Sequence, residues 1–121
     1  MEQDSLIQES KELLEKYLEE HPYTHIDGKM YSVTKDKQNL LNNAIAVYQM
    51  KTQMGLPAEI KWNATGKPCT VWDIQDIIPL ALAIASYVEP LITYQQDLEI
   101  AIRNCTTKPE LFEIVIDYEF V

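Results

Sequence analysis

Residues 73–104, DIQDIIPLALAIASYVEPLITYQQDLEIAIRN, form the longest uninterrupted periodic stretch of the chain. The apolar side chains recur in steps of three and four residues, which is typical of one face of an α-helix. Asp73 is placed to cap this helix, with Asp76 three residues further on. The predicted core stripe consists of Ile74, Ile77, Ile78, Ala81, Ile84, Ala85, Val88, Leu91, Ile92, Leu98, Ala101 and Ile102.

Pro79 and Pro90 lie inside this predicted helix. Each proline removes an N–H from the hydrogen-bond ladder and bends the axis, so we expect a curved helix or several helical pieces in line. The most apolar run, residues 77–88, is shorter than the roughly 20 residues that a bilayer requires. We therefore expect a buried helix and no membrane partner. The Gln95-Gln96 pair interrupts the stripe and is expected to mark where the core gives way to solvent or to another subunit.

Two further helices precede this one. Residues 5–20 have a narrow apolar stripe and an acidic remainder, so this helix either lies on the domain or pairs with a copy from another subunit. Thr34 is placed to cap a second helix over residues 35–54, which Gly55 ends as a left-handed cap. The stripe predicted for this second helix consists of Leu40, Leu41, Ala44, Val47, Tyr48 and Lys51.

The remaining segments favour β-structure. Residues 23–26 and 29–33 flank Asp27-Gly28, a dipeptide that suits a type I′ hairpin turn, and residues 58–62 and 68–72 predict a second hairpin. A short helix is expected from Thr107 to Glu113, followed by a strand over residues 114–120 that needs a partner strand from one of the hairpins. The fold class is therefore α+β: a single domain with a long proline-kinked central helix, two further helices, small antiparallel hairpins and a C-terminal strand.

Composition limits the classes of function. The 121 residues make one domain, and 19 acidic against 10 basic side chains give a formal charge of −9, which disfavours binding to nucleic acid. Cys69 and Cys105 lack a metal-binding spacing and are expected to be buried, reduced thiols. The seven tyrosines are expected at core edges, and a subset exposed together would indicate a binding surface.

Two side-chain groups could carry chemistry. His21, His25 and Asp27 could in principle supply metal ligands, and Glu110, Glu113, Asp117 and Glu119 could supply the paired carboxylates of a hydrolase. A helix end, a hairpin and a solvent-facing edge explain these residues more simply. No glycine-rich phosphate loop or nucleophile elbow occurs in the sequence. We therefore predict no enzyme activity, no catalytic or metal-binding residue and no cofactor.

A set of short motifs resembles a known family. The motifs are residues 27–34, DGKMYSVT, then Gln38-Asn39-Leu40, Trp62, Thr65-Gly66, Trp72 and residues 87–91, YVEPL. This order is similar to a domain of unknown function found in tailed-bacteriophage and prophage proteins, often at the C-terminus of tail-fibre or tail-associated chains. The similarity covers roughly residues 23–118.

The resemblance implies a phage or prophage setting and a phage-tail-associated α+β domain over residues 23–121. Residues 1–22 then form an N-terminal helix that is a candidate oligomerisation element. We expect a non-enzymatic interaction or structural module, associated with the tail or assisting tail assembly, that binds a tail protein and forms a homo-oligomer. The alternative is a small acidic phage regulator that binds a host protein. Because the first residues lack a secretory signal, we expect synthesis in the bacterial host cytoplasm, with carriage in the virion left open.

Overall fold

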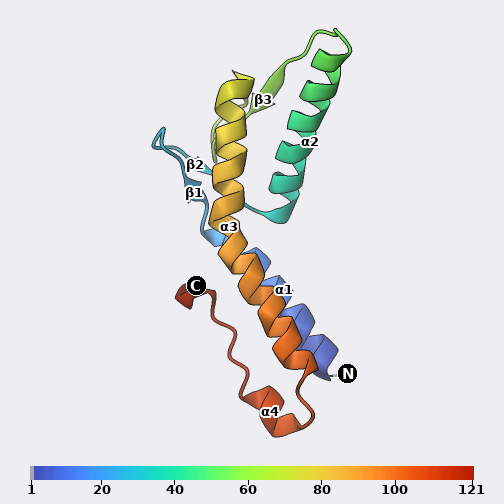
Figure 1. The fold of residues 1–121 in the computed structure, drawn as a ribbon. Coiled ribbons are helices and arrows are strands. Elements are labelled where there is room, and N and C mark those ends of the chain that lie inside the picture. The colour runs from blue at the N-terminus through green and yellow to red at the C-terminus, as the bar shows by residue number, and fades with distance from the viewer. Residues whose placement is uncertain (1) are drawn as a thin grey trace.

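A computed structural model describes residues 2–121 and is drawn in Figure 1. The elements along the chain are α1 (Glu2–Glu20), β1 (Tyr23–Thr24), β2 (Met30–Tyr31), α2 (Lys35–Gln53), β3 (Ile60–Trp62), β4 (Thr70–Trp72), α3 (Ile74–Arg103), α4 (Lys108–Phe112) and the 3-10 helix η1 (Tyr118–Phe120). The predicted α+β class, with one long helix and two small antiparallel hairpins in a single domain, is confirmed.

Helix α3 is the longest element and packs against both α1 and α2. The side chain of Asp73 accepts a hydrogen bond from the Gln75 N–H at 2.9 Å, so the predicted cap is confirmed. The helix continues through both Pro79 and Pro90, and Figure 1 shows its axis changing direction near the middle. An 18-residue window of α3 has a mean hydropathy of 1.6, enough by length and composition alone to cross a membrane. In the folded chain the stripe containing Ile77, Ile84 and Val88 lies in the core.

The first half of α3 packs against α2 and the hairpins, on the upper side of Figure 1. Its fully buried Ile77 and Leu80 belong to the same core as Tyr31, Leu41 and Trp62. The two hairpins form separate two-stranded sheets. In the second hairpin Ile60 pairs with Trp72, and Trp62 pairs with Thr70.

The second half of α3 packs against α1, which runs antiparallel to it (Figure 1). Ile7, Ser10 and Leu18 are the buried residues of α1. Near the N-terminus the Gln3 side-chain amide donates to the carbonyls of Ile102 and Cys105. At the other end of α1, the Tyr87 hydroxyl donates to the His21 carbonyl at 2.9 Å. Residues 5–20 thus lie on the domain, the first of the two arrangements that the sequence left open.

The first hairpin has a different turn from the predicted type I′. The Gly28 N–H donates to the His25 carbonyl, which makes residues 25–28 the turn. Gly28 has φ 78°, but no residue other than glycine has positive φ within residues 2–121, so Asp27 is not left-handed. This is a type I turn followed by a left-handed glycine. The Asp27 carboxylate fixes it by accepting from the Lys29 N–H and the Tyr31 hydroxyl.

The predicted C-terminal strand is wrong. The chain over residues 114–117 has no partner strand and is followed by η1. Both hairpins flank the first half of α3, whereas residues 113–121 lie beside α1 and the second half (Figure 1). The strand-forming residues are therefore placed where this chain offers them no strand to pair with.

Several predicted burial assignments are also wrong. Gln95 is buried inside the stripe of α3 and does not interrupt it, and Leu80, absent from the predicted stripe, is fully buried. Leu40 and Val47 of α2 are exposed. The expectation of buried thiols fails for Cys69, which is exposed, and both cysteines are free.

Candidate interaction surfaces

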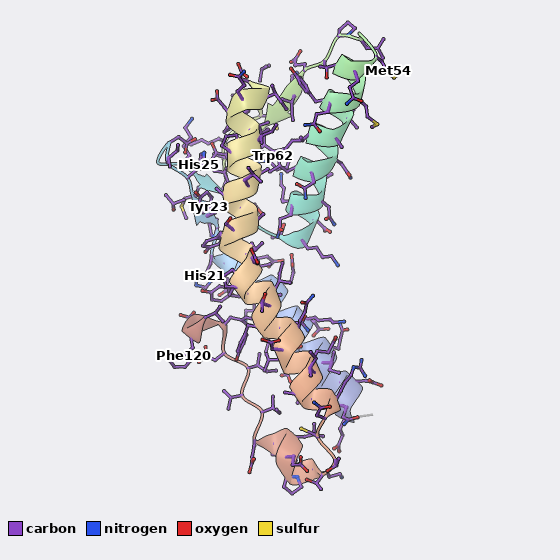
Figure 2. All side chains as sticks on the ribbon, viewed as in Figure 1. His21, Tyr23, His25, Met54, Trp62 and Phe120 are labelled. Atoms are coloured by element: carbon purple, nitrogen blue, oxygen red, sulfur yellow. The ribbon has the colours of Figure 1, made fainter. Side chains whose placement is uncertain are left out.

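The histidines considered as metal ligands have structural partners. His21 stacks on Tyr17, with ring centroids 3.9 Å apart, and its Nδ1 lies 2.8 Å from the Tyr17 carbonyl. His25 projects from the first hairpin, and Figure 2 shows it well separated from His21. Within residues 2–121, no group of three or more His, Cys, Asp or Glu side chains is arranged to hold a metal ion.

A groove of about 590 Å³ lies between the two hairpins and the start of α3. Asp27 and Tyr31 line it, joined by a 2.7 Å hydrogen bond. Burial disfavours ionisation of Asp27, but hydrogen bonds from Tyr31 and the Lys29 N–H outweigh it and hold the pKa of the carboxyl below its usual value. Burial and the neighbouring Asp27 raise the pKa of the Tyr31 phenol. The pair is thus fixed as a carboxylate and a neutral phenol that together brace the turn.

The C-terminal acidic residues do not form one group, and Glu110 and Glu119 each make a separate contact within the fold. Glu110 accepts hydrogen bonds from the hydroxyls of Thr106 and Thr107, which hold the pKa of its carboxyl below the usual value. Glu119 lies 3.7 Å from the His21 ring. These positions give Glu110 the role of a helix-capping residue and place Glu119 beside α1.

The tyrosines do not form an exposed group. Tyr31 and Tyr118 are buried, and the other five, Tyr17, Tyr23, Tyr48, Tyr87 and Tyr94, are half-buried at the edge of the core. Their hydroxyls reach backbone groups in several cases, as with Tyr87 and Tyr118. The exposed side chains that remain to make an interaction surface are instead aliphatic residues, methionines and phenylalanines.

The first such surface is the C-terminal segment, which we define as residues 113–121. Burial alternates along it: Ile114 and Ile116 are half-buried, whereas Val115 between them is 71% exposed. Tyr118 anchors the segment by donating from its hydroxyl to the Ser10 carbonyl at 2.6 Å, whereas Phe120 is 89% exposed and projects from the molecule (Figure 2). Over residues 114–116 the alternation is that of a β-strand with one face on the protein, and it ends where η1 begins at Tyr118.

The extended part of this segment, residues 114–117, has two backbone N–H groups without a partner in residues 2–121. The Tyr94 hydroxyl donates to the Val115 carbonyl and accepts from the Asp117 N–H. Among the described residues, no protein group bonds to the N–H of Val115 or of Ile116. Unpaired donors and acceptors on an extended chain are a template for adding another strand.

The second surface is a stripe along α2, which we call the α2 stripe: Leu40, Val47, Met50 and Met54. All four side chains are exposed. Beside the stripe, α2 and β3 enclose a groove of about 310 Å³ that Leu40, Val47, Lys51 and Ile60 help to line. Figure 2 shows Met54 at the far end of α2, remote from α3.

Charge is strongly segregated between the two ends of the molecule. Residues 2–20 and 89–121 contain 14 of the 19 acidic side chains and four of the 10 basic ones, a formal charge of −10. Residues 21–88 carry the remainder, with a formal charge of +1. The C-terminal segment therefore lies at a highly acidic end, and the α2 stripe lies at a nearly neutral one (Figure 1).

No family model, curated protein or solved structure matches this chain. Sequence reasoning missed the α2 stripe because it assigned Leu40 and Val47 to the core. The signal that could have found it is the seven-residue spacing of Leu40, Val47 and Met54, which places them on one side of α2 and apart from Leu41. The outward position of Val115 follows from the alternation within the predicted strand once Tyr118 is known to be the buried anchor, whereas Phe120 is exposed because the chain turns into η1 at Tyr118.

Proposed function

We propose that this chain is a non-enzymatic protein-interaction module of a phage or prophage, associated with the tail or assisting tail assembly. The observation that carries the interaction role is the C-terminal segment, in which residues 114–117 are extended, the N–H groups of Val115 and Ile116 are unpaired within residues 2–121, and Val115 and Phe120 are exposed. The phage setting and the tail partner rest on the sequence resemblance described above.

The partner is expected to bind by strand addition. Its backbone would pair with the edge that carries the free N–H of Ile116, as an extended peptide does at an open sheet edge. Adjacent residues of a strand bond to opposite sides, and the backbone groups of Val115 and Asp117 are on the side of Tyr94. Phe112 and Phe120, both exposed, flank this edge and supply apolar area for side-chain recognition.

Charge defines the chemistry of the partner further. Glu113, Asp117 and Glu119 lie within the segment, and α1 beside it is also strongly acidic. Like charges placed opposite each other in a pair of strands are destabilising, whereas opposite charges stabilise the pair. The expected partner strand therefore alternates apolar residues with lysine or arginine.

The proposal is tested by capture of tail proteins on the immobilised chain, using disrupted tails from an induced prophage culture. We expect the wild-type chain to retain a tail protein. The Val115→Glu variant should retain at least ten-fold less of that protein. Val71→Glu is the matched control, because Val71 is a valine of an extended segment with 63% exposure, close to that of Val115, in the other half of the molecule. Failure of the wild-type chain to retain any tail protein would overturn the tail assignment.

The alternative proposal is a small acidic regulator that binds a host protein. It is favoured by one observation, the concentration of acidic residues in one half of the molecule, because a surface of this kind can compete with nucleic acid for a basic site. The same capture from host lysate distinguishes the two proposals. Retention of a nucleic-acid-binding host protein that is released by moderate salt would support the regulator, whereas retention of tail protein alone would exclude it.

A further inference from the structure

Helix α2 has two different apolar faces. The inner face contains buried Leu41 and half-buried Ala44, Ile45 and Tyr48, which pack against the core. At about 100° per residue, the α2 stripe is centred roughly 120° around the helix from that inner face. One face therefore packs inside the chain, and the other is left in solvent.

The chain as a whole has more accessible surface than a compact monomer needs. The surface is 8146 Å², whereas a compact monomer of 14.0 kDa has about 6,700 Å². The excess of roughly 1,400 Å² on this one chain is more than the ~800 Å² that each partner contributes to a standard protein–protein interface. An apolar stripe on such a surface is expected to be covered by a partner.

The α2 stripe is complementary to itself. Leu40 and Met54 each lie seven residues from Val47, one on either side. In an antiparallel pair with a two-fold axis at Val47, Leu40 of one copy meets Met54 of the other, and the two copies of Val47 meet each other. Lys51 then lies opposite Asn43 and not opposite a second lysine. A two-fold interface requires this kind of self-complementarity, because each copy uses the same patch.

From this geometry we propose that a second copy of the chain covers the α2 stripe, forming a two-fold dimer through antiparallel α2 helices centred on Val47. This inference deepens the proposed interaction role by assigning self-association to α2, and it uses a surface separate from the C-terminal segment. It assigns self-association to α2 in place of α1, the candidate oligomerisation element of the sequence analysis, because the apolar stripe of α1 faces α3.

Electrostatics favours the antiparallel orientation. Helix α2 is the one α-helix in residues 2–121 with a net positive formal charge, having Lys35, Lys37 and Lys51 against Asp36. The acidic end of the molecule extends beyond the start of α2 (Figure 1). Antiparallel pairing directs the two acidic ends in opposite directions, whereas parallel pairing would place two charges of −10 side by side.

The first test is the mass of the purified full chain in solution by light scattering. We expect twice 14.0 kDa for the wild-type chain and a folded monomer for Val47→Glu. Ile100→Glu is the matched control, because Ile100 is a 60% exposed β-branched residue in the half of α3 that α2 does not reach, and it should remain a dimer. Far-UV circular dichroism establishes that each variant is folded.

The second test is disulfide cross-linking in a Cys69→Ser, Cys105→Ser background. Val47→Cys should cross-link to itself under mild oxidation. Leu40→Cys alone should not, since in the antiparallel pair it faces position 54, and the two positions are about 21 Å apart along one helix. A mixture of Leu40→Cys and Met54→Cys chains should form a heterodimeric cross-link, because a disulfide requires Cα atoms within about 7 Å.

A monomeric wild-type chain, a dimer that survives Val47→Glu, or equal loss of the dimer in Ile100→Glu would overturn the inference. Cross-linking of Leu40→Cys to itself would overturn the antiparallel arrangement, and a mass that grows without limit would indicate a head-to-tail contact instead. None of these outcomes depends on tail-protein capture. The dimer and the proposed partner can therefore fail separately.

Discussion

At the scale of single residues, Tyr118 is the contact that attaches the C-terminal segment to the helices. Its ring lies against Tyr94 with centroids 5.2 Å apart, and its buried hydroxyl donates to the Ser10 carbonyl. Burial, with a smaller contribution from Tyr94, raises the pKa of Tyr118 from 10.0 to about 12. The folded chain therefore favours the neutral phenol, and this preference stabilises the fold fully below pH 10 and is lost as the pH rises towards 12.

We predict that Tyr118→Phe lowers the free energy of unfolding at pH 8 by about 1–2 kcal/mol, because the buried Ser10 carbonyl loses its donor. At pH 11 the difference between wild-type and variant should shrink, because the phenol is then mostly ionised in the unfolded wild-type chain, and this ionisation favours unfolding. Urea unfolding at both pH values measures this. If wild-type and variant differ in free energy of unfolding by the same amount at pH 8 and pH 11, the prediction is wrong. The contribution of the hydroxyl would then be independent of its protonation state.

Gln95 shows why residue-level reasoning from sequence reaches a limit. Its place in the stripe, four residues after Leu91 and three before Leu98, is a core position by spacing, but glutamine is usually exposed. It is buried because the Gln95 amide donates to the Ser10 hydroxyl at 3.3 Å, and that hydroxyl donates to the Ile7 carbonyl. The partner is 85 residues away in the chain, so no local pattern could predict it.

At the scale of elements, caps and helix ends were predictable and strand pairing was not. Asp73, Thr34 and Gly55 act within one turn of their own position, so local sequence determines them. Residues 114–117 have strand composition, but a strand also requires a neighbour. The two hairpins that could have supplied one are held at the opposite half of α3 by Trp62 and Tyr31 in the core.

Helix α1 is expected to stabilise the second half of α3. Ile7 is buried on α1, Ser10 of α1 contacts Gln95 of α3, and α3 packs more extensively against α1 than against any other element. Deletion of residues 1–20 should therefore reduce the helical circular dichroism signal by more than the deleted residues account for, because the end of α3 unfolds with them. A loss equal to the deleted helix alone would mean that α3 holds its shape without α1.

At the scale of the whole molecule, the long helix α3 separates two surfaces with different properties. The α2 stripe lies at a nearly neutral end, and the C-terminal segment lies at an end with a formal charge of −10. An apolar, weakly charged surface is suited to pairing with an identical copy, whereas the acidic end is suited to a basic partner. Self-association should therefore persist at high salt, and partner binding should weaken.

The central claim is that the chain works by adding a partner strand to residues 113–117. Amide hydrogen exchange, measured on the free chain and on its complex with the captured tail protein, tests this most directly. We predict fast exchange at Val115 and Ile116 in the free chain, where these N–H groups have no protein partner, and strong slowing at Ile116 in the complex. Unchanged exchange at the Ile116 amide in a complex that has formed would contradict the account.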